Sequence, residues 1–178
     1  QLEEMAIDED KICRMVILHS HFDHCAIVPF FKKRWPQATI TASSRAKELL
    51  STRKVIDGIR FLNDAVAAKY ERRDVLAALN VDFPGIEVES VASEGDRYGC
   101  GDLSLEILEV PGHSSCSIAV YVPELRAMFT SDSGGIPFGE KVFTAANSDF
   151  DKYMKSLDKI MAYDIDVHLA EHYGARTG

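Results

Sequence analysis

The amino-acid sequence predicts an α/β fold, and three observations support this. First, an apolar, β-branched run at 12–18 is followed by a helix-like stretch at 26–35 and a second strand-like run at 38–42. Second, apolar and polar residues alternate along 86–92 and 103–110, as they do in half-buried strands. Third, a chain of 178 residues with 46% hydrophobic and 27% charged residues can bury the core of one globular domain.

A long helical stretch separates the two groups of predicted strands. From about 44 to 79, apolar residues repeat at helical spacing, and we expect Asp57-Gly58 and the run 71–74 to divide the stretch into two or three helices. The stretch is interpreted either as a packed helical layer or as a mobile lid over a pocket. Residues that suit helix N-caps precede this stretch and a later helix: Ser43 or Ser44, and Ser148 or Asp149.

The C-terminal half continues with further strands and one helix. Runs at 117–122 and 126–131 flank a short turn, which is a β-hairpin signal. A helix is predicted at about 148–162 and a last strand at 166–170. Because the sequence contains no internal repeat, low-complexity tract or linker, we expect a single domain over residues 1–178.

Charge and cysteine usage restrict the partners and the compartment. The net charge of −8 argues against nucleic acid and against an anionic membrane surface, because phosphate binding relies on clustered Lys and Arg. No apolar run approaches the roughly 18 residues that a membrane span needs. Four widely spaced cysteines are expected to be reduced and mostly buried, which predicts a cytoplasmic protein: Cys13, Cys25, Cys100 and Cys116.

Side chains that can bind a metal ion follow four of the predicted strands. The first strand ends in the sequence HSHFDH (19–24), and each of three later strand ends carries one such side chain. The candidate ligands are His19, His21, Asp23, His24, His113, Asp132 and His172. Loops at strand ends are where a rigid scaffold usually presents functional side chains. His168 lies inside a predicted strand and is therefore left out of the set.

The spacing within HSHFDH favours a metal site over the alternative of a polar loop at a strand end. In an extended segment, residues two apart face the same way, so His19 and His21 can bind one ion. Asp23 and His24 follow where the chain begins to turn, and they can face a neighbouring ion. Imidazole and carboxylate ligands suit zinc, iron or manganese better than calcium.

The motif HSHFDH, followed by PGHS (111–114), SDS (131–133) and a final histidine, resembles the metallo-β-lactamase fold superfamily, in which these motifs arrive in this order. The resemblance covers nearly the whole chain from about residue 12. It implies an αββα sandwich with two divalent metal ions at one edge, zinc being the first expectation and iron or manganese the alternatives. The implied ligands are His19, His21 and His113 for the first ion, Asp23, His24 and His172 for the second, and Asp132 as a bridge.

The resemblance also implies a metal-dependent hydrolase. In such an enzyme a hydroxide held by the two ions would attack an ester-like bond of a small-molecule substrate: a thioester, lactone, ester or phosphodiester. Asp23 is the candidate catalytic residue, which would orient the hydroxide and accept its proton. One alternative is a metal-containing ligand-binding or regulatory module of the same fold with little turnover. A di-iron redox protein is less favoured, because such proteins usually carry Glu where His21 stands.

The sequence departs from the family pattern in two local positions and at its start. The family normally places a strand-rich segment before the histidine motif, so we expect this chain to be an N-terminally incomplete domain. An exposed sheet edge would then favour a homo-oligomer. Leu18 stands where Thr or Ser often precedes the first histidine, and Cys116 stands where Gly is common.

Substrate specificity is expected to come from two segments outside the motifs. The helical stretch 44–79 is longer than in compact members of the family and suggests a substrate cover. The segment 133–141 is interpreted as a pocket lining, with Phe138 and Lys141 as contacts, or equally as a polar loop. Glu171 could accept a hydrogen bond from a ligand histidine, but a solvated surface position is the favoured interpretation.

Overall fold

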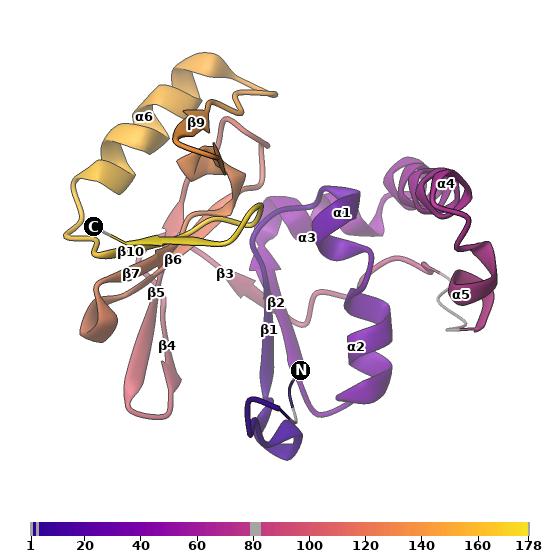
Figure 1. Cartoon of the computed structure of the whole chain (residues 1–178). Coiled ribbons are helices and arrows are strands. Elements are labelled where there is room, and N and C mark those ends of the chain that lie inside the picture. Colours follow the sequence, from indigo (N-terminus) through magenta and orange to yellow (C-terminus); the bar gives the residue numbers. More distant parts are fainter. Residues whose placement is uncertain (1, 3, 79–82, 178) are drawn as a thin grey trace.

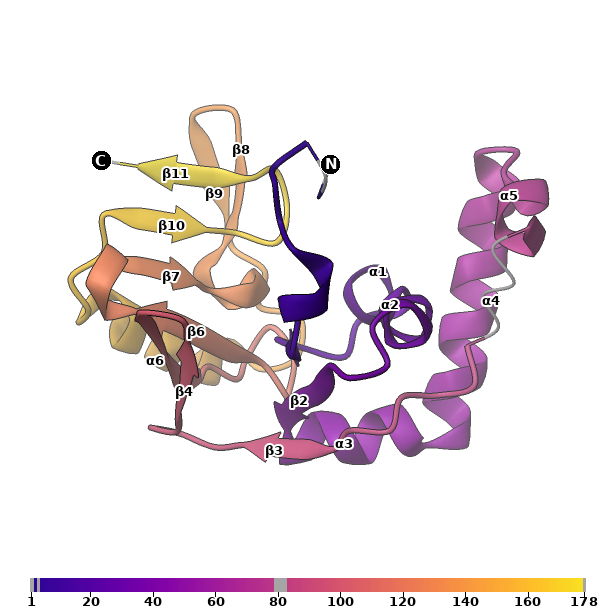
Figure 2. The same cartoon turned by 90° about the horizontal axis from the view of Figure 1, so that it is seen from below.

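The structure is a computed structural model that describes residues 2, 4–78 and 83–177, and it confirms the predicted α/β class (Figure 1). Two β-sheets lie face to face. Helices α1 to α4 lie outside the first sheet, and α6 lies outside the second (Figure 1). Helix α5 lies beside α4, on the side of the molecule remote from α6 (Figure 2). The layers therefore follow the order αββα.

The strand orders are β1-β2-β3 in the first sheet and β11-β10-β7-β6-β5-β4 in the second, with a separate β8-β9 hairpin. The strands are β1 (Arg14–Ile17), β2 (Thr39–Ser43), β3 (Ser90–Ala92), β4 (Arg97–Cys100), β5 (Leu103–Glu109), β6 (Ile118–Val122), β7 (Ala127–Phe129), β8 (Ile136–Phe138), β9 (Lys141–Phe143), β10 (Val167–Leu169) and β11 (Ala175–Thr177). The helices are α1 (Phe22–Cys25), α2 (Val28–Arg34), α3 (Ser44–Ser51), α4 (Arg53–Lys69), α5 (Arg73–Ala78) and α6 (Phe150–Met161), with short 3₁₀ turns η1 (Glu9–Lys11), η2 (Pro123–Leu125) and η3 (Ser131–Gly134).

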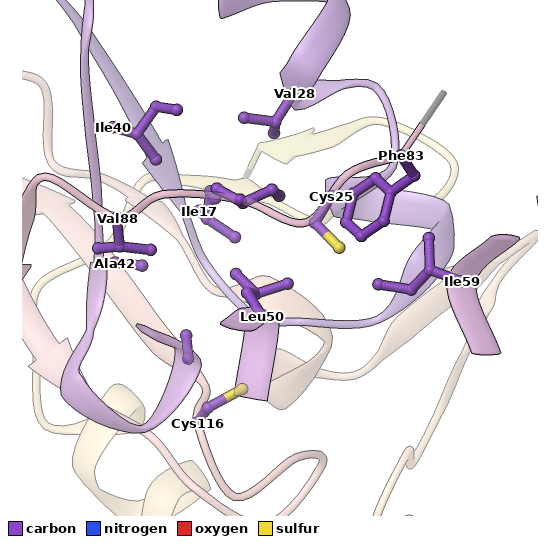
Figure 3. Packing of buried hydrophobic residues seen from close by; sticks show 12 residues of the cluster. Ile17, Cys25, Val28, Ile40, Ala42, Leu50, Ile59, Phe83, Val88 and Cys116 are labelled. Carbon is purple, nitrogen blue, oxygen red and sulfur yellow. The ribbon is translucent and has the colours of Figure 1, made fainter. Parts of the chain in front are cut away.

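The first sheet is parallel, and the helices that connect its strands also cover it. β1 pairs in parallel with β2, and β2 pairs in parallel with β3. An apolar cluster fills the space between this sheet and its helices, and it includes Ile17, Ile40, Leu50 and Phe83 (Figure 3). Full burial of such a side chain stabilises the fold by about 1.5–3 kcal/mol. This cluster holds the helical layer against the sheet.

The second sheet is covered by α6 on one face and by the first sheet on the other. β4 to β7 are joined as consecutive antiparallel neighbours, and β10 pairs in parallel with β7. Ile160 of α6 packs against Leu108 and Met128 on the outer face. Ile118 and Val120 face the other way and pack with Leu18 between the sheets. All five residues of β6 are buried because layers cover both of its faces.

A backbone hydrogen bond joins the two sheets at the end of β1. The Ile118 N–H donates to the Leu18 carbonyl at 2.9 Å, directly before His19. Further along the same interface, the Arg14 guanidinium lies over the Tyr98 ring, 4.3 Å from its centroid. The end of β1 is therefore held against the start of β6, at the edge where the candidate ligands gather.

Most predicted elements are confirmed, but the strand predicted at 86–92 is shorter. The chain pairs as a strand only from Ser90 to Ala92. Before that, the Ile40 N–H donates to the Glu89 carboxylate at 2.9 Å, while the Glu89 N–H donates to the Ile40 carbonyl. The Glu89 carboxylate thus accepts from the Ile40 N–H, a backbone donor that would otherwise pair with a neighbouring strand. Residues 86–89 therefore do not pair as a strand.

Of the two breaks predicted in the helical stretch, the one near 71–74 is confirmed and the one at Asp57-Gly58 is wrong. The stretch divides at Thr52 and again at 70–72, while Asp57-Gly58 lies inside α4. Asp57 accepts from the Arg53 Nε at 2.8 Å, one helical turn away, which supports the helix through the glycine. The last predicted residue, 79, lies outside the described residues. Four short strands were not predicted: β4, β8, β9 and β11.

The predicted caps and the N-terminal segment are held by specific hydrogen bonds. Ser43 caps α3, since its Oγ accepts from the Ala46 N–H at 3.1 Å and donates to the Cys116 carbonyl at 2.8 Å. Asp149 caps α6. Glu9 accepts from Arg34 Nε at 2.6 Å and from the Trp35 indole at 2.7 Å. These hydrogen bonds lower the pKa of Glu9 to about 2.

The four cysteines are free thiols. Cys25 and Cys116 are buried, whereas Cys13 and Cys100 are exposed, so the prediction of mostly buried thiols holds for two of the four. Burial raises the pKa of the Cys25 thiol to about 12. Within the part of the chain that the structure describes, no helix has the length and apolar character needed to cross a membrane.

Candidate metal centre

The predicted ligands come together at one edge of the sandwich. β5, β7 and β10 run in the same direction, because β6 lies antiparallel between β5 and β7 while β10 is parallel to β7. Their carboxyl ends therefore share an edge, and β1 of the first sheet ends beside it. The ligands sit as follows: His19 and His21 after β1, Asp23 and His24 in α1, His113 after β5, Asp132 in η3 after β7, and His172 after β10.

Three histidines form the more buried group of the site. One ring nitrogen each of His19, His21 and His113 lies within 4.8 Å of the other two. His21 Nδ1 is 2.9 Å from His113 Nε2. The other nitrogen of His113, Nδ1, lies 2.8 Å from the Ala145 carbonyl, which can only accept. His113 Nδ1 therefore carries the proton, and Nε2 directs its lone pair into the group.

His19 is oriented in the same way by a carboxylate. Its Nδ1 lies 2.9 Å from Glu171 Oε2 and 3.0 Å from Ser131 Oγ, while Ser131 also donates to that carboxylate oxygen at 3.1 Å. The favoured interpretation of Glu171 as a solvated residue was wrong, because its side chain is only 18% exposed. Glu171 Oε1 also lies 3.7 Å from His24 Nδ1. Glu171 thus contacts one histidine of each candidate ligand group.

A second, more accessible group consists of Asp23, His24 and His172. Asp23 Oδ2 lies 3.5 Å from His24 Nε2 and 3.6 Å from His172 Nε2. The Asp23 side chain is 41% exposed, whereas that of His19 is fully buried. Solvent can therefore reach the site from the side of this second group.

Asp132 lies between the two groups. Its Oδ2 is 3.4 Å from His113 Nε2 and from His172 Nε2, and 3.6 Å from His24 Nε2. The side chain is only 5% exposed. One carboxylate oxygen therefore contacts histidines from both groups.

The pKa shifts of His21, His113 and Asp132 suit a bound cation, whereas that of His24 favours its protonated form. Burial, reinforced by neighbouring imidazoles, lowers the pKa of His21 to about 4, and burial also lowers the pKa of His113. Burial opposes protonation of His24 as well, but the carboxylates of Asp132 and Glu171 outweigh it and raise the pKa of His24. Burial would raise the pKa of Asp132, yet the surrounding histidines hold it below its usual value. Neutral imidazoles and an ionised carboxylate are the forms that bind metal ions.

Buried polar atoms of the cluster that lack hydrogen-bond partners in the described part of the chain also favour a bound cation. His19 Nε2, His24 Nε2 and Asp132 Oδ1 are buried without a hydrogen-bond partner among the described residues. Such an atom costs about 1–3 kcal/mol when left unsatisfied. Ligand atoms around a tetrahedral ion with bonds of about 2.0–2.1 Å lie roughly 3.3 Å apart. The distance of 2.9 Å between His21 Nδ1 and His113 Nε2, and those of 3.4 to 3.6 Å from Asp132 and Asp23 to their histidines, are close to this value.

Packing of α6 positions the loop that carries His113. Gly112 has a φ of +133°, and a Cβ at this position would lie 2.3 Å from Tyr153 Cα. The Tyr153 hydroxyl accepts from the Ala145 N–H at 3.2 Å, and Ala145 in turn accepts from His113. This chain of contacts was not predicted from the sequence. No local pattern could have found it, since α6 and the loop are brought together only by the fold.

The remaining sequence-predicted residues lie around the cluster. His168 Nε2 is 2.8 Å from Thr130 Oγ1, and His168 belongs to none of the metal-capable groups within the described residues. Phe138 on β8 is 59% exposed and lies edge-on to Tyr173, with ring centroids 5.4 Å apart. Lys141 is exposed on β9. The roles suggested for Phe138 and Lys141 in substrate binding remain predictions.

A four-layer sandwich whose histidine-rich edge joins two metal-capable groups through one carboxylate defines the class of the protein. The chain belongs to the metallo-beta-lactamase superfamily, whose family model matches residues 2–172.

Among curated proteins, this chain is similar to the metallo-beta-lactamase fold-containing protein ST1585 of Sulfurisphaera tokodaii. The two are 27% identical over 158 residues, which cover 84% of this chain and 56% of that protein. A shorter match joins 46 residues to hydroxyacylglutathione hydrolase of Ruegeria pomeroyi at 41% identity, covering 26% of this chain and 18% of that protein. This chain therefore spans about half the length of ST1585.

Solved structures share the fold. The crystal structure of ST1585 from Sulfolobus tokodaii gives a TM-score of 0.69 at 23% identity, covering 94% of this chain and 64% of that one. BJP-1, a subclass B3 metallo-beta-lactamase of Bradyrhizobium japonicum, gives 0.64 at 21% identity over 96% and 60% of the two chains. The crystal structure of TTHA1623 in a di-iron-bound form gives a TM-score of 0.64 at 20% identity, covering 93% of this chain and 72% of that one.

Proposed function

We propose that this protein is a hydrolase that uses two divalent metal ions to cleave an ester-like bond in a small-molecule substrate. The observation that carries the proposal is the contact of one Asp132 oxygen with histidines of two adjacent metal-capable groups. Those groups contain buried nitrogen and oxygen atoms without hydrogen-bond partners among the described residues. Two ions would engage the His19, His21 and His113 group and the Asp23, His24 and His172 group together.

The proposed ligand set divides by burial. The first ion would be held by His19, His21 and His113, the second by Asp23, His24 and His172, and Asp132 would serve both. Glu171 and the Ala145 carbonyl would hold His19 and His113 in the tautomers that direct Nε2 toward the first ion. We propose zinc as the resident metal, with iron or manganese as alternatives, because all three accept imidazole and carboxylate ligands.

Bound metal ions would supply Lewis acidity and a water of lowered pKa. Asp23 would orient the attacking water and accept its proton, since its carboxylate lies at the solvent-exposed side of the cluster. From there the proton can pass to bulk water. The buried histidines exclude solvent from the opposite side, so a substrate would approach over Asp23 and His172.

The comparisons support hydrolysis as the reaction class. The chain is similar to proteins named hydroxyacylglutathione hydrolase and, in fold, to a metallo-beta-lactamase. The bond cleaved by this chain is proposed only as far as a thioester, lactone, ester or phosphodiester. Nucleic acid and membranes are not proposed as partners, given the net charge of −8. A cytoplasmic location and a homo-oligomeric state are further proposals.

The test combines elemental analysis with hydrolysis assays. Purified protein should contain close to two divalent ions per chain, and it should hydrolyse at least one substrate in a panel of esters, thioesters, lactones and phosphodiesters. A chelator should abolish the activity, and His21→Ala should lower both metal content and activity. His168→Asn is the matched control, because His168 contacts Thr130 and no metal-capable group among the described residues.

Hydrolysis that is indifferent to chelator and to His21→Ala would refute the proposal. Tight binding of a small molecule over the metal ions without turnover would instead favour a ligand-binding or regulatory module.

A further inference from the structure

Two hollows open beside the candidate metal centre, on the side of α1 that faces α4. The larger has a volume of about 570 Å³ and is lined by Phe22, Asp23, Ala26, Ile27, Asn63, Val66, Ala67, Tyr70, Arg72 and Val75. We call it the α1–α4 cavity. The smaller has a volume of about 300 Å³ and includes His21, Phe22 and Asp23 in its lining. The volume of the α1–α4 cavity lies within the range of small-molecule binding sites.

The lining of the α1–α4 cavity is mostly apolar. Ile27, Val66, Tyr70 and Val75 are 42%, 40%, 63% and 42% exposed, so large apolar side chains from α4, α5 and the loop after α1 stand open to solvent around one hollow. Water is displaced favourably from such a surface by an apolar group. The lining therefore suits an alkyl or aryl group.

The α1–α4 cavity adjoins the proposed reaction site. Asp23 lines both hollows and belongs to the second metal-capable group, and His21, which lines the smaller one, belongs to the first. Asp23 and Phe22 are neighbours in α1, so the polar end of the cavity and its apolar wall are adjacent. A substrate whose reacting bond lies over Asp23 would extend any long substituent along α4.

We propose that the α1–α4 cavity binds an apolar substituent of the substrate, an alkyl chain or aromatic ring attached to the cleaved ester-like bond. The inference rests on the proposed hydrolase function and narrows its substrate class to amphiphilic esters or thioesters. A second copy of the chain is the competing occupant. The sharing of Asp23 with the metal-capable cluster favours a ligand that reaches the reacting atoms.

The first test compares esters that differ only in an apolar chain. Ethyl acetate, ethyl hexanoate and hexyl acetate are hydrolysed by the metal-loaded protein, and proton release is measured. Each methylene that enters an apolar site should raise kcat/KM about two- to fourfold. Either ethyl hexanoate or hexyl acetate should therefore have a kcat/KM at least about tenfold above that of ethyl acetate. Equal kcat/KM values for the three esters would overturn the inference while leaving the hydrolase function in place.

Variants on α4 assign the preference to the α1–α4 cavity. Val66→Asp places a charge in the cavity. The ratio of kcat/KM for the better of ethyl hexanoate and hexyl acetate to kcat/KM for ethyl acetate should then fall below about threefold. Phe61→Asp is the matched control, because Phe61 lies on the same helix, is 72% exposed and lies outside both linings. Phe61→Asp should keep the wild-type ratio. An equal loss of the ratio in both variants would overturn the assignment to the cavity.

A binding measurement separates this inference from the proposed function. Sodium hexanoate at millimolar concentration should shift the methyl NMR signals of Ile27, Val66 and Val75, whereas acetate should not. If no compound in the panel of esters, thioesters, lactones and phosphodiesters is hydrolysed, the hydrolase function fails, and these shifts alone decide whether the cavity binds an alkyl chain. Unshifted methyl signals, together with a dimer that Val66→Asp converts to a monomer in sedimentation, would assign the surface to a second copy and overturn the proposal.

Discussion

Removal of the Glu171 carboxylate should weaken metal binding although Glu171 is not in the proposed ligand set. The carboxylate accepts from His19 Nδ1 at 2.9 Å and from Ser131 Oγ at 3.1 Å, and its other oxygen lies 3.7 Å from His24 Nδ1. In Glu171→Ala, the His19 ring loses its carboxylate acceptor and keeps beside Nδ1 only the Ser131 hydroxyl, which can donate as well as accept. Its Nε2 is then no longer held in the form that offers a lone pair to a metal.

The magnitude follows from the kind of contact that is lost. Loss of an acceptor behind a metal-binding histidine typically lowers metal affinity 10- to 100-fold, which corresponds to about 1.4–2.7 kcal/mol. Glu171→Gln keeps an oxygen that can accept from His19 but removes the charge. The difference between a charge-assisted and a neutral hydrogen bond is about 1 kcal/mol, so we expect a loss of about fivefold.

The assay is a zinc titration against a competing chelator, with circular dichroism to confirm that each variant is folded. Glu124→Ala is the control, since Glu124 accepts hydrogen bonds from Ser104 far from the cluster. The expected order of affinity is wild type and Glu124→Ala, then Glu171→Gln, then Glu171→Ala. An affinity of Glu171→Ala within twofold of wild type would show that the carboxylate does not position His19, and the reasoning would be refuted.

Three further predictions concern stability and are read from urea unfolding midpoints. Gly112→Ala should destabilise the fold by ~3 kcal/mol, because its Cβ would meet Tyr153 backbone; a loss below 1 kcal/mol would contradict this. Ser43→Ala should cost about 1–2 kcal/mol through the lost cap and buried hydrogen bond, and an unchanged midpoint would argue against it. Glu9, whose pKa is lowered by Arg34, stabilises the folded state above its unfolded pKa, and this stability is lost as the pH falls toward about 2. Glu9→Gln should therefore be less stable than wild type at pH 7 and equally stable near pH 2, and a pH-independent difference would contradict the assignment.

The order of the elements could be predicted from local patterns. Period-two alternation and apolar runs identified the strands that became β1, β2, β5, β6, β7 and β10. The break predicted at Asp57-Gly58 was wrong because a glycine lowers helix propensity only by about 1 kcal/mol, which the Arg53–Asp57 pair and packing of α4 can offset. β4 and β11 were missed because they are short and polar, and each forms by antiparallel pairing with the adjacent strand in the sequence, β5 for β4 and β10 for β11.

The sequence by itself determined which residues can bind metal ions and at which strand ends they lie, because ligand chemistry and local periodicity are properties of neighbouring residues. Only the tertiary structure decided how those residues group. The approach of Asp132 to His113 and His172, the turn of Glu171 toward His19 and the α1–α4 cavity beside Asp23 all depend on contacts between distant segments. The physical reason is that side-chain separations of a few ångströms are set by the packing of layers, which no local pattern encodes.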